Sequence, residues 1–195
     1  SANTSGKPAP TTAAHVFADM EGKIPLIIDG GACRVGVEST VIAVNGGIIS
    51  ILRPGAITAE MLSEFAEVEV DKAVLGQLES GRKAASPGMK YKHYSPNAEV
   101  FLVDGNSDKF NAYANAFAEN NACAVVFDGE NPPEIPYYIY GKTHEEQAAK
   151  IFGILREIDE NGFAKAFIML PDTGGEGLAV YNRLIRAAAF KIVHL

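Results

Sequence analysis

Tryptophan is absent from this chain of 195 residues, and cysteine occurs only twice, as Cys33 and Cys123. The two cysteines are far apart in the sequence and have small or apolar neighbours, so we interpret both as buried, reduced thiols. No apolar run approaches the roughly 18 residues that a membrane-spanning helix requires. Residues 1–12 are small and polar, unlike a signal peptide. These absences predict a cytoplasmic protein without a membrane partner.

Positive charge is scarce as well, because 17 Lys and Arg residues face 24 Asp and Glu residues and the net charge is −7. A surface that binds nucleic acid through its phosphates needs an excess of basic groups, so the charge gives no support to direct contact with tRNA. A hydrophobic content of 47% is ordinary for a globular protein. The length allows one large or two small domains.

The first part of the chain consists of short apolar runs separated by turn residues. Gly46 and Gly47 offer the tight connection of a hairpin. Thr58 is placed to cap a helix with Glu60 in its first turn. The predicted elements are a short helix over 10–19, strands over 24–29 (buried), 39–44 and 46–55, a helix over 58–66, and an edge strand over 67–70.

The last hundred residues alternate regularly between strands and helices. Thr143 and Glu146 have the spacing of a capping box at a helix start. The predicted strands are 99–104, 123–128, 136–141 and 166–171; the helices are 108–120, 143–161 and 175–190, with Ala148, Ile151, Phe152, Leu155 and Ile158 as the apolar stripe of the second. This alternation predicts a small three-layer α/β domain with a mostly parallel sheet.

Between these parts, residues 72–96 show no convincing core face. Their end, SPGMKYKHYSP over 86–96, holds two lysines, a histidine and two tyrosines between two prolines. Such polar groups are suited to anions and nucleotides, but the segment has neither helical nor strand periodicity. It is either a plain linker or a linker that lies across a site.

Short polar residues stand at the ends of several predicted strands. Small hydroxyls and amides let a ligand approach the backbone, and an arginine offers a planar fork for phosphate or carboxylate. Each could also be ordinary turn or loop chemistry, although Arg53 is harder to explain by packing. The candidates from the residues alone are Ser1, Asn3, Ser39, Thr40 and Arg53.

Three other features have weaker functional interpretations. The loop over 172–177 (DTGGEG) lacks the ending of a P-loop, so a turn for close packing is favoured over a nucleotide site. Arg183, Arg186 and Lys191 could contact RNA, but a solvated helix face is the favoured interpretation. The histidines show no ligand spacing with one another or with the cysteines, so no protein-bound metal is expected.

Four motifs carry a family resemblance: SANTSGKPAPTTA, VGVESTVIAV, ILRPGAIT and SPGMKYKHYSP. In this order and spacing they resemble the YrdC-like threonylcarbamoyl-AMP synthases, and GEGLAVYNRLIRAAA resembles the glycine-rich helix of the extra C-terminal domain in their long form. The resemblance implies an α/β fold in three parts: part of a YrdC-like catalytic domain over 1–75, a linker spanning the active site over 76–97, and a Rossmann-like domain over 98–195.

The resemblance also implies a reaction and its participants. Members join L-threonine, bicarbonate and ATP into threonylcarbamoyl-AMP and pyrophosphate, and downstream machinery transfers the group to tRNA. ATP is a substrate that Mg²⁺ accompanies through its phosphates; double-stranded RNA binding is a property of the family as a whole. Catalysis is by positioning and charge stabilisation. The implied site residues are Ser1, Asn3, Thr11, Ser39, Thr40 and Arg53 for L-threonine and ATP, and Lys90, Tyr91 and His93 for the reacting groups.

One departure qualifies this expectation. The family's YrdC-like domain begins well before the SAN element, and its Lys/Arg nucleotide motif lies in that earlier part. We therefore expect little synthase activity from this chain alone, and exposed apolar edges in residues 1–75. Two alternatives stay open: an RNA-binding or tRNA-modification assembly module, and a carbamoyl-adenylate-forming domain of another pathway.

Overall fold

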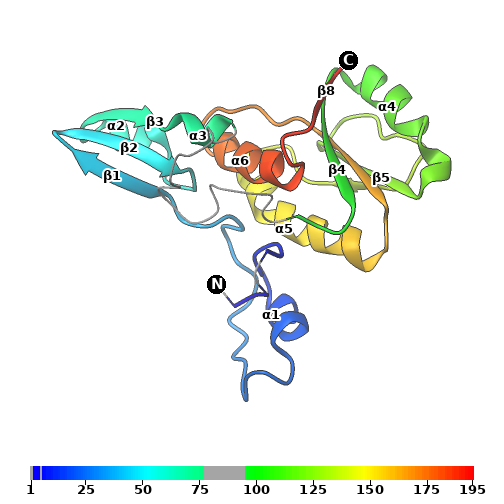
Figure 1. Ribbon diagram of the computed structural model, residues 1–195, viewed down its shortest axis with the longest axis horizontal. Coiled ribbons are helices and arrows are strands. Elements are labelled where there is room, and N and C mark those ends of the chain that lie inside the picture. The colour runs from blue at the N-terminus through cyan, green and yellow to red at the C-terminus, as the bar shows by residue number, and fades with distance from the viewer. Residues whose placement is uncertain (1, 5, 77–94) are drawn as a thin grey trace.

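The computed structural model describes residues 2–4, 6–76 and 95–195 (Figure 1). In these residues the chain forms two separate sheets, one of three strands and one of five. In the described ranges, no helix is long and apolar enough to cross a membrane.

The three-stranded sheet lies in the first part of the chain. β1 (Val41–Asn45) and β2 (Ile48–Arg53) form the predicted hairpin. Gly46 and Gly47 make its turn with φ values of 59° and 84°, which glycine adopts without strain. β3 (Glu67–Val70) adds a parallel edge strand beside β2. The helix before β3, α2 (Ala59–Ser63), begins as predicted at Thr58, whose side chain accepts a hydrogen bond from the backbone N–H of Met61.

Two predictions for this part were wrong. Residues 24–29 form no strand, and Leu26 and Ile28 are 71% and 85% exposed. A strand needs a neighbour to satisfy its backbone groups, and no strand of the described chain pairs with this run. The start of the segment over 72–96 does have a core face, because α3 (Lys72–Leu75) forms there and buries Ala73 and Val74. The predicted first helix is α1 (Ala13–Met20).

The five-stranded sheet confirms the parallel α/β prediction. Its order is β6-β5-β7-β4-β8, and every pairing is parallel. The strand at the C-terminal end of the chain, β8, was not predicted, because its three residues are too few to show a periodicity. The strands are β4 (Glu99–Asp104), β5 (Ala122–Val126), β6 (Tyr137–Ile139), β7 (Lys165–Met169) and β8 (Ile192–His194).

Helices cover both faces of this sheet and complete three layers (Figure 1). α5 (His144–Glu160) and α6 (Gly177–Ala187) pack on one face, against Val100 and Leu102 of β4. α4 (Ser107–Asn115) packs on the other face with Val103, and the 3-10 helix η1 (Ala118–Asn120) follows it. The predicted capping box and apolar stripe of α5 are confirmed.

Candidate functional site

The residues expected to bind substrates fall into two groups in the structure. Asn3 and Thr11 lie on the segment before α1, whereas Ser39, Thr40 and Arg53 lie where β1 begins and β2 ends. The remaining candidates, Ser1, Lys90, Tyr91 and His93, are outside the described residues.

Thr11 is held from three sides. Its backbone N–H donates to His15 Nδ1 at 3.2 Å, its hydroxyl lies 3.2 Å from the same nitrogen, and its carbonyl accepts from the N–H of Cys33 at 2.8 Å. Because His15 Nδ1 accepts the Thr11 N–H, it must be unprotonated. Burial, followed by the nearby Arg156, lowers the pKa of His15 and so favours that neutral form.

A cavity of about 230 Å³ opens beside Thr11. It is lined by Thr11 itself, its neighbours Pro10 and Thr12, residues 27–31 and Cys33. That volume lies just below the usual range of small-ligand pockets, which suits a small polar molecule better than a whole nucleotide. Cys33 is exposed, so the prediction that it is buried was wrong; Cys123 is buried, and burial raises the pKa of its thiol to about 12.

Arg53 holds the second group together. Its Nε and one terminal nitrogen donate to the carbonyl of Ser39 at 3.2 and 3.0 Å, while the Thr40 hydroxyl donates to the carbonyl of Ile57 at 2.7 Å. A side chain at Gly55 would reach within 2.5 Å of the Thr40 nitrogen, so only glycine fits there. The other terminal nitrogen of Arg53, Nη1, has no hydrogen-bond partner among the described residues, so it can donate to a phosphate oxygen.

In the described part of the chain, no hydrogen bond joins Thr11 to the group around Arg53. We call the residues around Thr11 the first half-site and those around Arg53 the second half-site. Asn3, near the first half-site, folds its own loop by donating to the carbonyls of Thr4 and Lys7 at 3.0 and 3.2 Å.

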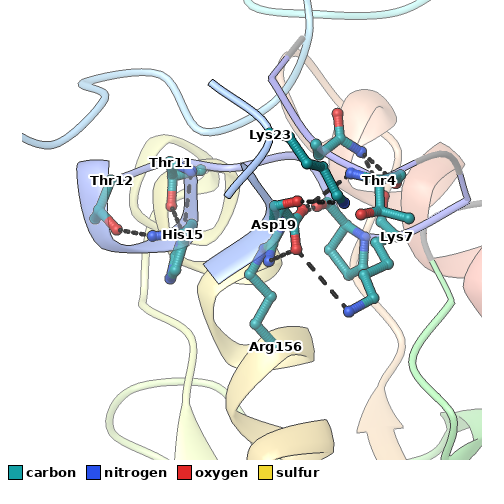
Figure 2. A network of polar contacts seen from close by, with 10 residues as sticks. Thr4, Lys7, Thr11, Thr12, His15, Asp19, Lys23 and Arg156 are labelled. Atoms are coloured by element: carbon teal, nitrogen blue, oxygen red, sulfur yellow. Dashed lines mark hydrogen bonds and ion pairs between the residues drawn. The ribbon is translucent and has the colours of Figure 1, made fainter. Parts of the chain in front are cut away.

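A buried ion pair that sequence reasoning missed supports the first half-site (Figure 2). Arg156 of α5 donates to Asp19 Oδ2 at 2.8 Å and to Oδ1 at 3.3 Å, and also to the carbonyl of Pro8 at 2.6 Å. The hydrogen bond from Arg156 lowers the pKa of Asp19 more than any other cause. These partners are 137 residues apart, and no local pattern links them.

Two further arginines, both on α6, connect the five-stranded domain to the region of the three-stranded sheet. Arg183 donates to Glu38 Oε2 at 2.8 Å and to the Pro54 carbonyl at 2.7 Å, and Arg186 donates to the Ala73 carbonyl at 2.7 Å. Their exposed fractions are 0% and 2%, so the interpretation as a solvated helix face was wrong for both arginines, whereas Lys191, which follows α6, is exposed. No local pattern distinguished these buried arginines from exposed ones, because α6 also carries polar residues such as Asn182.

The loop over 172–177 packs closely. A side chain at Gly177 would come within 2.7 Å of the Asp172 carbonyl oxygen and 3.0 Å of His144 Nε2. His144 Nε2 lies 2.7 Å from Asp172 Oδ2. This geometry supports the close-packing interpretation for Gly177, whereas Gly175 has no atom within 4 Å and a φ of 51°, which favours glycine in a turn. In the described part of the chain, no group of three or more His, Cys, Asp or Glu residues is arranged to hold a metal ion.

Comparison with known proteins places these features in a family. The family model for the C-terminal domain of threonylcarbamoyl-AMP synthase matches residues 57–189, and a model described as telomere recombination matches residues 1–55. The chain is 40% identical to the threonylcarbamoyl-AMP synthase of Pyrococcus abyssi over 199 residues, covering 99% of this chain and 58% of the relative. It is 37% identical to the Bacillus subtilis enzyme of that name over 204 residues, covering 99% and 57%.

Solved structures agree with this result. The crystal structure of P. abyssi Sua5 complexed with L-threonine superposes with a TM-score of 0.85 at 37% identity, covering all of this chain and 58% of that one. The chain thus spans somewhat more than half the length of the relatives that it matches. It belongs to the threonylcarbamoyl-AMP synthase family.

Proposed function

We propose that this chain is part of an L-threonylcarbamoyladenylate synthase, which converts L-threonine, bicarbonate and ATP into threonylcarbamoyl-AMP and pyrophosphate. The observation that carries the proposal is the 40% identity to the P. abyssi synthase over 99% of this chain. The product would pass to machinery that transfers the threonylcarbamoyl group to tRNA.

The two half-sites suit different substrates. The cavity beside Thr11 has the size for L-threonine and offers a hydroxyl for hydrogen bonding. Arg53 keeps one terminal nitrogen for an ATP phosphate while its other nitrogens fix Ser39, so binding and positioning would share one guanidinium. Mg²⁺ would arrive with ATP as part of the substrate. In this proposal Asn3 belongs to the half-site of Thr11, and Thr40 to the half-site of Arg53.

The division of the chain is part of the proposal. Residues 1–75 would contribute catalytic-domain surface, and residues 98–195 would form the C-terminal domain. Residues 76–97 would span the site and bring Lys90, Tyr91 and His93 to the reacting groups, whereas Ser1 would help to bind L-threonine and ATP. Their contribution would be positioning and charge stabilisation, since an oxygen of the carbamate formed from the L-threonine nitrogen and bicarbonate must be aligned with the α-phosphate as pyrophosphate leaves.

The first experiment is L-threonine binding to this chain by calorimetry, with pyrophosphate release by the complete gene product measured in parallel. Thr11→Val removes the hydroxyl without changing the shape, and it should weaken L-threonine binding by about fivefold or more. Ser50→Ala is the matched control, because the Ser50 hydroxyl bonds Glu69 in the small sheet. The proposal fails if neither the chain nor the complete product responds to L-threonine.

We also expect slow pyrophosphate release from this chain alone, because it spans only 58% of the P. abyssi synthase that it matches. A rate equal to that of the complete product would contradict this. Replacing L-threonine and bicarbonate by carbamoyl phosphate tests the other adenylate-forming pathway. The RNA-binding alternative has no support from Arg183 and Arg186, which are buried.

A further inference from the structure

The Asp19 carboxylate is a junction between three parts of the chain (Figure 2). It receives Arg156 from α5, the backbone N–H of Thr4 at 3.2 Å, and the ammonium group of Lys7 at 3.9 Å. The side chains of Asp19 and Arg156 are only 1% and 7% exposed. One buried carboxylate thus ties the segment before α1 to a helix of the C-terminal domain.

Arg156 also holds this segment directly. Its terminal nitrogen donates to the Pro8 carbonyl at 2.6 Å, so the segment is fixed at Thr4 through Asp19 and at Pro8 through Arg156 itself. These anchors stand between Asn3 and Thr11, the two described candidates of the first half-site. His15, which accepts the Thr11 N–H, also lies against α5. A side chain built at Gly153 of α5 would be 3.9 Å from the His15 ring.

Stability alone is a weak explanation for such a pair. Burying two charges costs desolvation, and apolar residues of similar volume often stabilise a protein equally well or better. What apolar residues cannot do is accept the Thr4 N–H and donate to the Pro8 carbonyl. The specific product of this ion pair is therefore the backbone conformation of residues 4–8.

We propose that Arg156 and Asp19 are positioning residues for substrate binding: the C-terminal domain, through α5, sets the conformation of the segment that carries Asn3 and Thr11. This inference rests on the proposed function, because it takes that segment to bind L-threonine. It gives the C-terminal domain a direct part in the reaction, although none of its residues need touch the substrate.

The test combines amide hydrogen exchange with L-threonine affinity. In Arg156→Gln, the backbone amides of Thr4, Lys7 and Thr11 should exchange about tenfold faster or more, because charge-assisted hydrogen bonds that hold this segment are lost. The dissociation constant for L-threonine should rise by a similar factor, while amides of β5 and β7 keep their protection. Arg183→Gln is the matched control: it removes a buried arginine of α6 that holds Glu38 and Pro54, and it should leave the exchange of residues 4–11 unchanged.

The double variant Asp19→Leu with Arg156→Met separates positioning from stability. It replaces the ion pair by apolar side chains, so the melting temperature should return toward that of the unaltered chain. Exchange of residues 4–11 and the dissociation constant should nevertheless stay raised. The inference is overturned if the double variant restores slow exchange, or if Arg156→Gln never disturbs it. Failure of the unaltered chain to bind L-threonine would count against the proposed function instead, since the exchange data need no ligand.

Discussion

Residues 98–193 contain nearly all of both hydrophobic clusters of the described chain, whereas residues 17–65 leave large apolar side chains in contact with solvent. From the first part only Val37 enters a cluster as a buried residue. Leu26, Ile28 and Phe65 are 71%, 85% and 81% exposed. The α/β domain therefore has a core of its own, whereas the first part buries fewer apolar side chains, such as Ile51 and Val74, and makes polar contacts with α5 and α6.

This difference explains why the buried arginines matter. A region that cannot bury enough apolar surface must be placed by directional bonds, and guanidinium groups supply several from one side chain. Arg156 holds the segment before α1. Arg183 holds Glu38, which precedes β1, and Pro54, which follows β2. Both half-sites are thereby positioned by helices of the other part.

The largest expected effect contrasts one phenylalanine from each part. Phe152 is 0% exposed between α5 and the sheet, and Phe65 is 81% exposed. Phe152→Ala should lower the free energy of unfolding by about 3–5 kcal/mol, because it leaves a cavity. Phe65→Ala should change it by less than about 0.5 kcal/mol. Denaturant titration measures both free energies of unfolding. Similar losses for the two variants would show that Phe65 is part of a packed core, which contradicts the contrast between the two parts.

A second prediction concerns the contact between the parts. A side chain at Gly36 would come within 2.3 Å of the Ala148 carbonyl oxygen of α5, whereas one at Gly30 would meet no atom within 4 Å. Gly36→Ala should cost about 1–3 kcal/mol, because backbone must move. It should also speed exchange in β1 while the α/β sheet stays protected. Gly30→Ala is the control, and an equal cost for the two would contradict the close packing.

A third, smaller effect concerns association. Leu26 and Ile28 are exposed in a run that forms no strand, and contiguous exposed apolar groups favour contacts between molecules. Leu26→Ser with Ile28→Ser should raise the monomer fraction in sedimentation velocity while stability changes by less than about 0.5 kcal/mol. Tyr137→Ser is the control, since it alters a 44% exposed residue of the α/β sheet. The same gain from it would remove the distinction between the two parts.

The same contrast explains which features the sequence could predict. The capping box at Thr143, the stripe of α5 and the hairpin turn at Gly46 are local patterns, and the structure confirms each. The run over 24–29 looks like a strand locally but lacks a partner, which no local pattern can supply.

The site was predictable to a smaller extent. Arg53 was singled out from its position at the end of a predicted strand, and Thr11 by motif resemblance. Asp19 and Arg156 were missed because their pairing depends on how α1 meets α5. Arg183 was misinterpreted for the same reason, since its partners Glu38 and Pro54 are 145 and 129 residues away in the sequence.

The smallest expected effect is the pH dependence from His15, which connects the first half-site to α5. Burial is the largest cause that lowers its pKa below 6.5, and Arg156 adds to it; Glu160, Asp19 and Glu157 act in the opposite direction. The folded protein then binds fewer protons at His15 than the unfolded chain does. The free energy of unfolding should therefore rise with pH up to about 6.5 and level off above it.

The geometry gives the same sign. A proton on Nδ1 would displace the Thr11 N–H, so falling pH should both weaken folding and release Thr11. His15→Gln keeps an acceptor that does not titrate, and the difference in unfolding free energy between it and the unaltered chain should shrink as pH falls below about 6.5. The three carboxylates keep this slope shallow. A difference that grows on acidification would mean that His15 is charged in the folded protein, and that the contact with Thr11 does not determine its protonation state.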